Sequence, residues 1–145
     1  MNFLKKHPSW LAALVLPALV LSPILLLAAA NPQGKEKDAE YAKKGRAIYV
    51  QLCVSCHGPS GKGDGPASGA LKKPPADLTN IAQKYNGFPG DKIMTWIDGE
   101  KASSAHGTRE MPVWGRQFRR ITGSQAEAMG EVYALTKYLE SIQKK

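Results

Sequence analysis

The sequence is short of cysteine, of acidic residues and of strand-like or repetitive stretches, and each shortage narrows what the chain can be. Two cysteines among 145 residues cannot build the disulfide framework of a small secreted scaffold. No run of alternating apolar and polar residues, internal repeat or low-complexity tract occurs, which argues against a sheet protein or a repeat array. The hydrophobic content of 43% supports a modest core, so we expect one domain with an appendage.

The shortage of acidic residues makes the chain basic. Its 20 lysines and arginines against 12 aspartates and glutamates give a formal net charge of +8. Such an excess is compatible with a solvated surface, and the alternative is a face that docks on a partner with an acidic surface. The candidates for this docking face are Lys72, Lys73, Arg116, Arg119 and Arg120. We expect no nucleic-acid partner, because the basic residues form no stripe along a helix and no nucleic-acid-binding motif is present.

The one long hydrophobic run lies near the N-terminus. Residues 10–30 are uncharged and almost wholly apolar, and a helix of this length can cross a bilayer. The preceding Lys5 and Lys6 favour a cytoplasmic N-terminus, which sends the remaining chain to the periplasmic side of a bacterial cytoplasmic membrane. The length favours an uncleaved anchor, whereas Ala28-Ala29-Ala30 is typical of a signal-peptide cleavage site, so both alternatives stay open.

These features predict three parts of the chain. Residues 1–30 are a signal peptide or an uncleaved membrane anchor, so the protein is either anchored or soluble after cleavage. Residues 31–38 are polar and include a proline and a glycine, which predicts a flexible linker. Residues 39–145 form the folded domain, and the motifs that carry chemistry all lie within it.

The pentapeptide Cys53-Val54-Ser55-Cys56-His57 uses both cysteines of the chain. Cysteines three residues apart lie on one side of a helical turn, so Cys53 and Cys56 can form thioethers with neighbouring vinyl groups of one porphyrin. The adjacent His57 can present an imidazole nitrogen to the iron as the proximal ligand. The spacing therefore predicts one covalent haem c.

Three other kinds of site use similar residues. A redox-active disulfide needs a thioredoxin-like strand and helix, and Gly58-Pro59-Ser60-Gly61 follows the motif instead. A zinc site would combine the motif with His106, but the adjacent Cys56 and His57 cannot easily share one tetrahedron. A structural disulfide between Cys53 and Cys56 would close too small a loop to restrain the unfolded chain, and would leave the histidine unexplained.

The second expected iron ligand is a methionine. A six-coordinate haem iron needs a distal ligand, and Met111, held in a loop by the following proline, can supply its thioether without disturbing a helix. Met94 and Met129 lie in expected helices, where a buried methionine is more often part of the core. His106 is a further alternative, which would make both ligands histidines. We expect His57 and Met111 to be the metal ligands.

Helical spacing defines the two ends of the domain. Apolar residues recur at helical spacing over residues 39–53, and again after a capping box that begins at Ser124. Short helices are expected between these two. We expect Tyr138 of the last helix to meet Gly45 and Tyr49 of the first helix, where the glycine permits a close approach.

Taken in order, these motifs resemble those of class I c-type cytochromes. The resemblance covers residues 39–145 and depends on Gly45 and Tyr49, Cys53-Val54-Ser55-Cys56-His57-Gly58, Gly61-Lys62-Gly63-Asp64-Gly65, Pro74-Pro75-Ala76-Asp77-Leu78, Met111-Pro112-Val113-Trp114 and Tyr138-Leu139. It implies a small all-α fold in which the first and last helices cross around one covalent haem. It also implies that His57 and Met111 are the axial ligands.

The resemblance implies further contacts around the haem. A carbonyl of Pro74-Pro75 would accept the proton on the outer nitrogen of His57. Trp114, together with Arg116 or Arg109, would lie near a haem propionate. The glycine-rich loop and the Met-Pro-x-Trp pattern are similar to those of cytochromes attached to respiratory complexes such as haem-copper oxidases.

These expectations predict an electron-transfer protein and not an enzyme. The chain would act as a tethered carrier, or as a subunit of a respiratory or photosynthetic complex. Redox proteins are the expected partners, and no small-molecule substrate need reach the iron. Two alternatives stay open: a haem subunit of a redox enzyme that acts on sulfur compounds, nitric oxide or peroxide, and a haem-based ligand sensor.

Overall fold

The structure is a computed structural model that describes residues 32–99 and 111–144. The chain divides into two units, residues 1–30 and 31–145, and the described residues all belong to the second unit. Within them, no helix is long and apolar enough to span a membrane. The predicted anchor or signal peptide, residues 1–30, lies outside the described residues.

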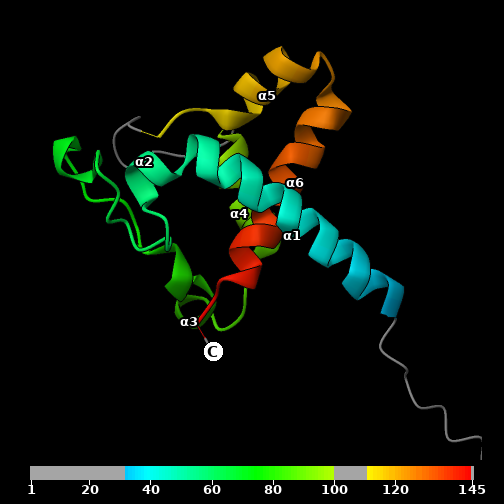
Figure 1. The fold of residues 1–145 in the computed structure, drawn as a ribbon, viewed down its shortest axis with the longest axis horizontal. Helices are drawn as coiled ribbons and strands as arrows, with labels where there is room; N and C mark the ends of the chain where they lie inside the picture. The colour runs from blue at the N-terminus through cyan, green and yellow to red at the C-terminus, as the bar shows by residue number, and fades with distance from the viewer. Residues whose placement is uncertain (1–31, 100–110, 145) are drawn as a thin grey trace, which may run out of the picture. The chain divides into compact units, whose positions relative to one another are not determined.

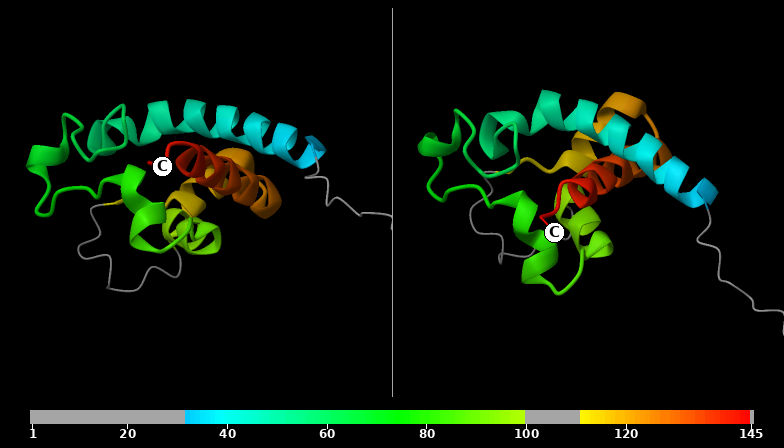
Figure 2. Two further views of the ribbon diagram at one scale, coloured as in Figure 1. Left: turned by 90° about the horizontal axis from the view of Figure 1, so that it is seen from below. Right: turned by 60° about the horizontal axis from the view of Figure 1, so that its bottom comes forward.

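Helices are the only regular elements in the described part of the chain, which agrees with the expected all-α class. They are α1 (Pro32–Leu52), α2 (Val54–His57), α3 (Ile81–Lys84), α4 (Gly90–Asp98), α5 (Trp114–Thr122) and α6 (Gln125–Ser141), with the 3-10 turns η1 (Ser68–Ala70) and η2 (Leu78–Asn80). α1 crosses α6 (Figure 1). In Figure 2, α6 lies between α1 and α4.

The crossing of α1 and α6 depends on Gly45. A Cβ atom at this position would overlap the backbone carbonyl of Ala134 in α6, so a glycine is required for the helices to approach so closely. One turn later Tyr49 is 1% exposed, and its ring centroid lies 5.0 Å from that of Tyr138. The predicted meeting of the first and last helices is therefore confirmed, and Ala134 is the residue opposite the glycine.

α1 begins at Pro32, within the stretch that was expected to be a flexible linker. Proline fits the first turn of a helix, because its missing N–H needs no partner there. Residues 32–38 are helical and correct the linker prediction. They lack the apolar stripe that places a helix in a sequence, which is why the pattern indicated a start near Ala39.

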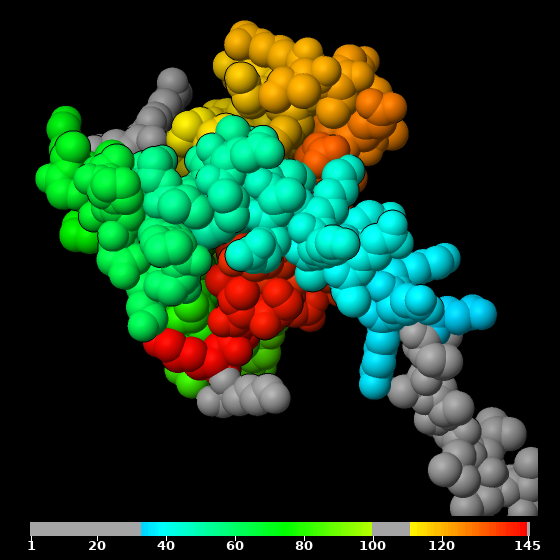
Figure 3. All heavy atoms as spheres, in the orientation of Figure 1, coloured from blue at the N-terminus to red at the C-terminus, as the bar shows by residue number. Residues whose placement is uncertain are grey.

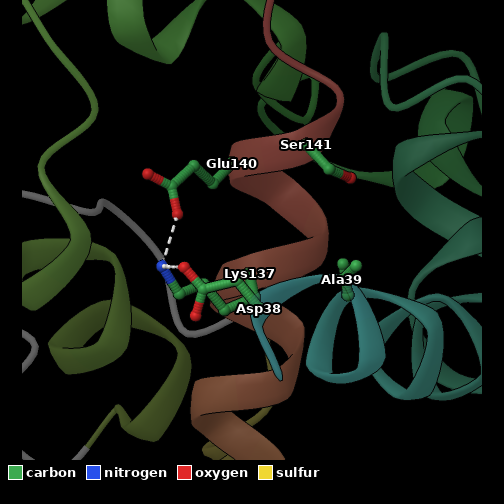
Figure 4. A pocket seen from close by; sticks show the side chains of 6 residues that line it. Asp38, Ala39, Lys137, Glu140 and Ser141 are labelled. Carbon is green, nitrogen blue, oxygen red and sulfur yellow. Dashed lines mark hydrogen bonds and ion pairs between the residues drawn. The ribbon is translucent and has the colours of Figure 1, made fainter. Parts of the chain in front are cut away.

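Polar and aromatic contacts attach the first turns of α1 to α6. The Asp38 carboxylate lies 2.9 Å from the Lys137 ammonium, which also lies 2.9 Å from the Glu140 carboxylate (Figure 4). Tyr41 packs edge-on against Tyr133, with 4.9 Å between the ring centroids. The hydrogen bonds to Asp38 and then to Glu140 raise the pKa of Lys137, so the charge that holds α1 here is lost only at strongly alkaline pH.

The hydrophobic core lies where α6 packs against α4 and α5. α6 contributes Val132 and Leu135, α4 contributes Ile93 and Ile97, and α5 contributes Phe118. In Figure 3, α1 (cyan) crosses the middle of the visible face, with the C-terminal end of α6 (red) below it and α5 (yellow-orange) above it. The sequence did not predict α5, because only two of its residues are buried and they form no extended apolar pattern.

Candidate functional site

The predicted attachment motif forms one helical turn at the end of α1. The Cys53 amide donates to the Tyr49 carbonyl at 2.9 Å, and the His57 amide donates to the Cys53 carbonyl at 2.9 Å. Cys53 and Cys56 are therefore one turn apart and lie on the same side of the chain, as the spacing predicts. Both thiols are free and half-buried.

The glycine-rich segment after the motif folds back and completes the hydrogen bonding of this turn. Four of its amides donate to carbonyls of the motif: Gly58 to Val54 at 2.9 Å, Ala67 to Ser55 at 2.8 Å, Gly65 to Cys56 at 3.1 Å and Gly63 to His57 at 2.9 Å. The Cys53 carbonyl already accepts within the turn. Every carbonyl of the motif thus has a backbone donor, either within the turn or in the glycine-rich segment that follows it.

Two glycines make room for this returning segment. A Cβ atom on Gly65 would overlap the carbonyls of Val54 and Ser55, and one on Gly63 would overlap the carbonyl of Pro75. Gly63 also has a φ of 79°, in the left-handed region that glycine adopts without strain. Pro75, which was predicted to bind His57, therefore places its carbonyl against Gly63 instead.

The His57 ring is oriented by the Ala76 carbonyl. Its Nδ1 lies 3.4 Å from the Ala76 oxygen, and because a carbonyl only accepts, Nδ1 carries the proton and Nε2 keeps a lone pair for a metal. Burial lowers the pKa of His57, while the hydrogen bond to Ala76 partly opposes this effect, so the ring is neutral at pH 7. The acceptor predicted in Pro74-Pro75 is thus corrected by one residue.

Tyr49 links α1 to the residue that follows the motif. Its hydroxyl donates a buried hydrogen bond of 2.7 Å to the Gly58 carbonyl. Burial is the main cause that raises the pKa of Tyr49, followed by the proximity of Cys53, so the hydroxyl keeps its proton and remains a donor. The sequence indicated Tyr49 as a residue of the helix crossing, and no spacing pattern could show its bond to Gly58.

The pKa and the oxidation state of the two thiols bear on the alternative interpretations as a redox-active disulfide or a structural disulfide. Burial raises the pKa of Cys53 to about 12, with a further contribution from Cys56, whereas a dithiol oxidoreductase needs a thiol of lowered pKa. The thiols are free, so the structural disulfide is not formed. Among the described residues, no group of three or more histidine, cysteine, aspartate or glutamate side chains is placed to hold a metal ion. His106, the additional ligand of the zinc alternative, lies outside them.

The predicted distal ligand, Met111, is not packed into the core. Its side chain is 46% exposed, at the start of the segment 111–113 that leads into α5. This segment lies at the same end of the domain as α2 (Figure 1). Met94 packs against the hydrophobic core, and Met129 is half-buried in α6. Of these three methionines, Met111 is the most exposed.

The residues predicted near a haem propionate lie at the start of α5. Trp114 begins the helix and stacks on Phe118, with 6.2 Å between the ring centroids, so part of its ring belongs to the core. Arg116 is exposed, and Arg109 lies outside the described residues. The structure therefore assembles the attachment turn and places Met111, Trp114 and Arg116 on one segment, which enters α5.

The groups present fit a covalently attached haem. The attachment turn offers two free thiols on one side and an imidazole whose Nε2 is available because Nδ1 binds Ala76. The segment before α5 offers an accessible thioether. These are the donors that a c-type haem with histidine and methionine ligands requires.

A family model described as Cytochrome c matches residues 42–143, which is most of the chain. The matched stretch includes the attachment turn, the glycine-rich segment that supports it and Met111. No curated protein and no solved structure matches the sequence.

Proposed function

The chain belongs to the cytochrome c family, and from this membership we propose that it transfers single electrons between redox proteins through one covalent haem c. Cys53 and Cys56 form the thioether bonds in this proposal, and His57 and Met111 are the axial ligands. The observation that carries it is the geometry of the attachment turn, where two free thiols precede an imidazole held by Ala76.

Each residue of the turn has a separate task in the proposed site. Cys53 and Cys56 would hold the porphyrin through two thioether bonds. The Ala76 carbonyl sets the tautomer and orientation of His57 and makes Nε2 a stronger ligand. The haem, when bound, supplies a one-electron couple. A methionine ligand favours a higher potential than a second histidine, which suits an acceptor from a quinol-oxidising donor or a donor to a terminal oxidase.

We place the domain on the periplasmic side of a bacterial cytoplasmic membrane, with residues 1–30 as its anchor or its cleaved signal. Residues 32–52 form one continuous helix, and Asp38 attaches its first turns to α6. A helix attached in this way has less reach than a flexible linker. This supports a fixed subunit of a respiratory or photosynthetic complex over a freely swinging carrier.

The proposed partners are redox proteins with acidic docking surfaces. The exposed members of the predicted docking face are Lys72, Lys73, Arg116 and Arg120. Arg119 is half-buried and pairs with Asp98 of the same chain, so it is not part of this face. Exposed positive charge of this kind acts mainly on the rate and orientation of docking.

The variant Met111→Ala tests the assignment of the distal ligand. The oxidised wild-type holoprotein should show the near-infrared charge-transfer band of a methionine–iron bond, and the variant should lose this band and have a lower reduction potential. Met94→Ala is the matched control, because Met94 packs against the core. It should lose stability by about 0.5–3 kcal/mol, because Met94 is partly buried, but keep the band.

Three outcomes would count against this proposal. An unchanged spectrum and potential in Met111→Ala would show that Met111 is not the ligand. A high-spin haem in the wild type would favour a subunit of a redox enzyme that acts on sulfur compounds, nitric oxide or peroxide. Carbon monoxide binding to the reduced wild type at neutral pH would favour a haem-based ligand sensor.

A further inference from the structure

Contacts on either side of residues 100–110 join the end of α4 to the start of α5. A Cβ atom on Gly115 would overlap the Asp98 carboxylate, and it would lie 2.9 Å from the Asp98 backbone oxygen. A Cβ atom on Gly99 would lie 3.1 Å from the Val113 Cα. Arg119 Nη1 lies 3.4 Å from Asp98 Oδ1. We call these five residues, Asp98, Gly99, Val113, Gly115 and Arg119, the clasp.

The negative charge of Asp98 stabilises α5 and not α4, the helix to which Asp98 belongs. Asp98 is the last residue of α4, where a carboxylate interacts unfavourably with the helix dipole. It lies instead against Gly115 in the first turn of α5, where a negative charge is favourable. Its pair with Arg119 is shielded from water, with 17% of the Asp98 side chain and 22% of the Arg119 side chain exposed. The carboxylate therefore links the end of α4 to the start of α5.

The clasp holds the chain directly after Met111. Val113, which contacts Gly99, is separated from Met111 by a single proline. The helix that carries Asp98, α4, is itself held in the core by Ile93 and Ile97. Met111 itself is about half exposed, so its position depends on the segment that carries it more than on packing of its own side chain.

We propose that Asp98, Gly115 and Arg119 are positioning residues for Met111, which hold its segment against α4 and so determine how readily the thioether leaves the iron. This inference rests on the proposed function, because it requires Met111 to be the distal ligand. An external ligand can replace a methionine only in the fraction of molecules whose methionine has moved away. Its apparent affinity therefore measures how firmly the segment is held.

Imidazole binding to the oxidised holoprotein tests the proposal. Gly115→Ala forces the Asp98 carboxylate out of its place, and Asp98→Asn keeps the shape but removes the charge that pairs with Arg119. We expect each variant to bind imidazole about tenfold more tightly than the wild type, with a weaker methionine–iron band. Arg120→Gln removes a positive charge from an exposed position on the same helix and should bind imidazole like the wild type.

A double variant separates positioning from a general loss of stability. Asp98 and Arg119 form one contact, so Arg119→Gln should raise the imidazole affinity in the wild-type background and add little to Asp98→Asn. A purely structural ion pair would lower the thermal midpoint and leave the imidazole affinity, measured well below that midpoint, unchanged. Asp98→Asn adds no heavy atom, so it keeps the test available if Gly115→Ala does not fold.

Met111→Ala distinguishes the two ways in which the proposal can fail. If it binds imidazole tightly while Asp98→Asn and Arg119→Gln bind like the wild type, the clasp does not position Met111 and the ligand assignment stands. If Met111→Ala has the band and the imidazole affinity of the wild type, Met111 is not the ligand, and the inference about the clasp is wrong together with the assignment.

Discussion

Tyr49 is the residue on which both the helix crossing and the attachment turn depend. Its ring packs against Tyr138 at the crossing of α1 and α6. Its hydroxyl donates to the carbonyl of Gly58, the residue directly after His57. One buried side chain thus connects the position of the last helix to the orientation of the motif.

Tyr49→Phe keeps the ring and removes the hydroxyl. The buried Gly58 carbonyl then keeps only the Gly61 amide as its donor, so we expect the free energy of unfolding of the holoprotein to fall by about 0.5–1.5 kcal/mol. Urea unfolding followed by circular dichroism measures this change. Tyr41→Phe is the matched control, because Tyr41 is 40% exposed, and it should change the free energy by less than about 0.5 kcal/mol. Equal losses in the two variants would contradict the role of the hydrogen bond.

The pH dependence of the free energy of unfolding, compared between the wild type and Tyr49→Phe, gives a second test. The pKa of Tyr49 in the folded protein is raised above its ordinary value of 10.0, so the unfolded chain loses this proton first as the pH rises. The extra stability of the wild type over Tyr49→Phe should therefore be constant below pH 10.0 and fall above it. A difference that grows with pH would show that the hydroxyl is not a buried donor.

At the scale of secondary-structure elements, α1 shows what a sequence pattern can and cannot reveal. Its apolar spacing predicted the helix and the crossing at Gly45, because burial leaves a periodic signal. Residues 32–38 were missed, because Asp38 holds them through a polar contact with α6 and not through apolar burial. The site follows the same rule: covalent attachment needs fixed residue types at fixed spacing, whereas the acceptor for His57 is the backbone of Ala76, which any residue could supply.

Two glycines of α1 provide a matched pair of variants for the crossing. A Cβ atom on Gly45 would overlap the Ala134 carbonyl, whereas one on Gly34 would meet nothing within 4 Å. We expect Gly45→Ala to lower the free energy of unfolding by about 3 kcal/mol or to prevent folding. Gly34→Ala should raise it by up to about 1 kcal/mol, because alanine favours the helix. Thermal and urea unfolding measure both, and similar effects in the two variants would contradict the crossing.

At the scale of the whole molecule, exposed lysines lie both near the attachment turn and at the far end of α1. Lys72 and Lys73 are exposed in the segment that leads to Ala76, whose carbonyl binds His57. Lys35 and Lys37 are also exposed, but they lie about 24–27 Å of helix before Cys53. Since charges are screened within about 10 Å at 0.1 M salt, only the first pair should act on a partner docked at the turn.

Small redox reagents of opposite charge test this difference without a natural partner. We expect replacement of Lys72 and Lys73 by glutamine to slow oxidation of the reduced holoprotein by ferricyanide about threefold at low salt. The difference should vanish near 1 M salt, where charges are screened within about 3 Å. With a cationic cobalt oxidant, the same change should speed the reaction, because a repulsion is removed. Replacement of Lys35 and Lys37 by glutamine changes the net charge equally and should have little effect. Equal slowing by both pairs would show that total charge, and not a docking face beside the attachment turn, steers the reagent.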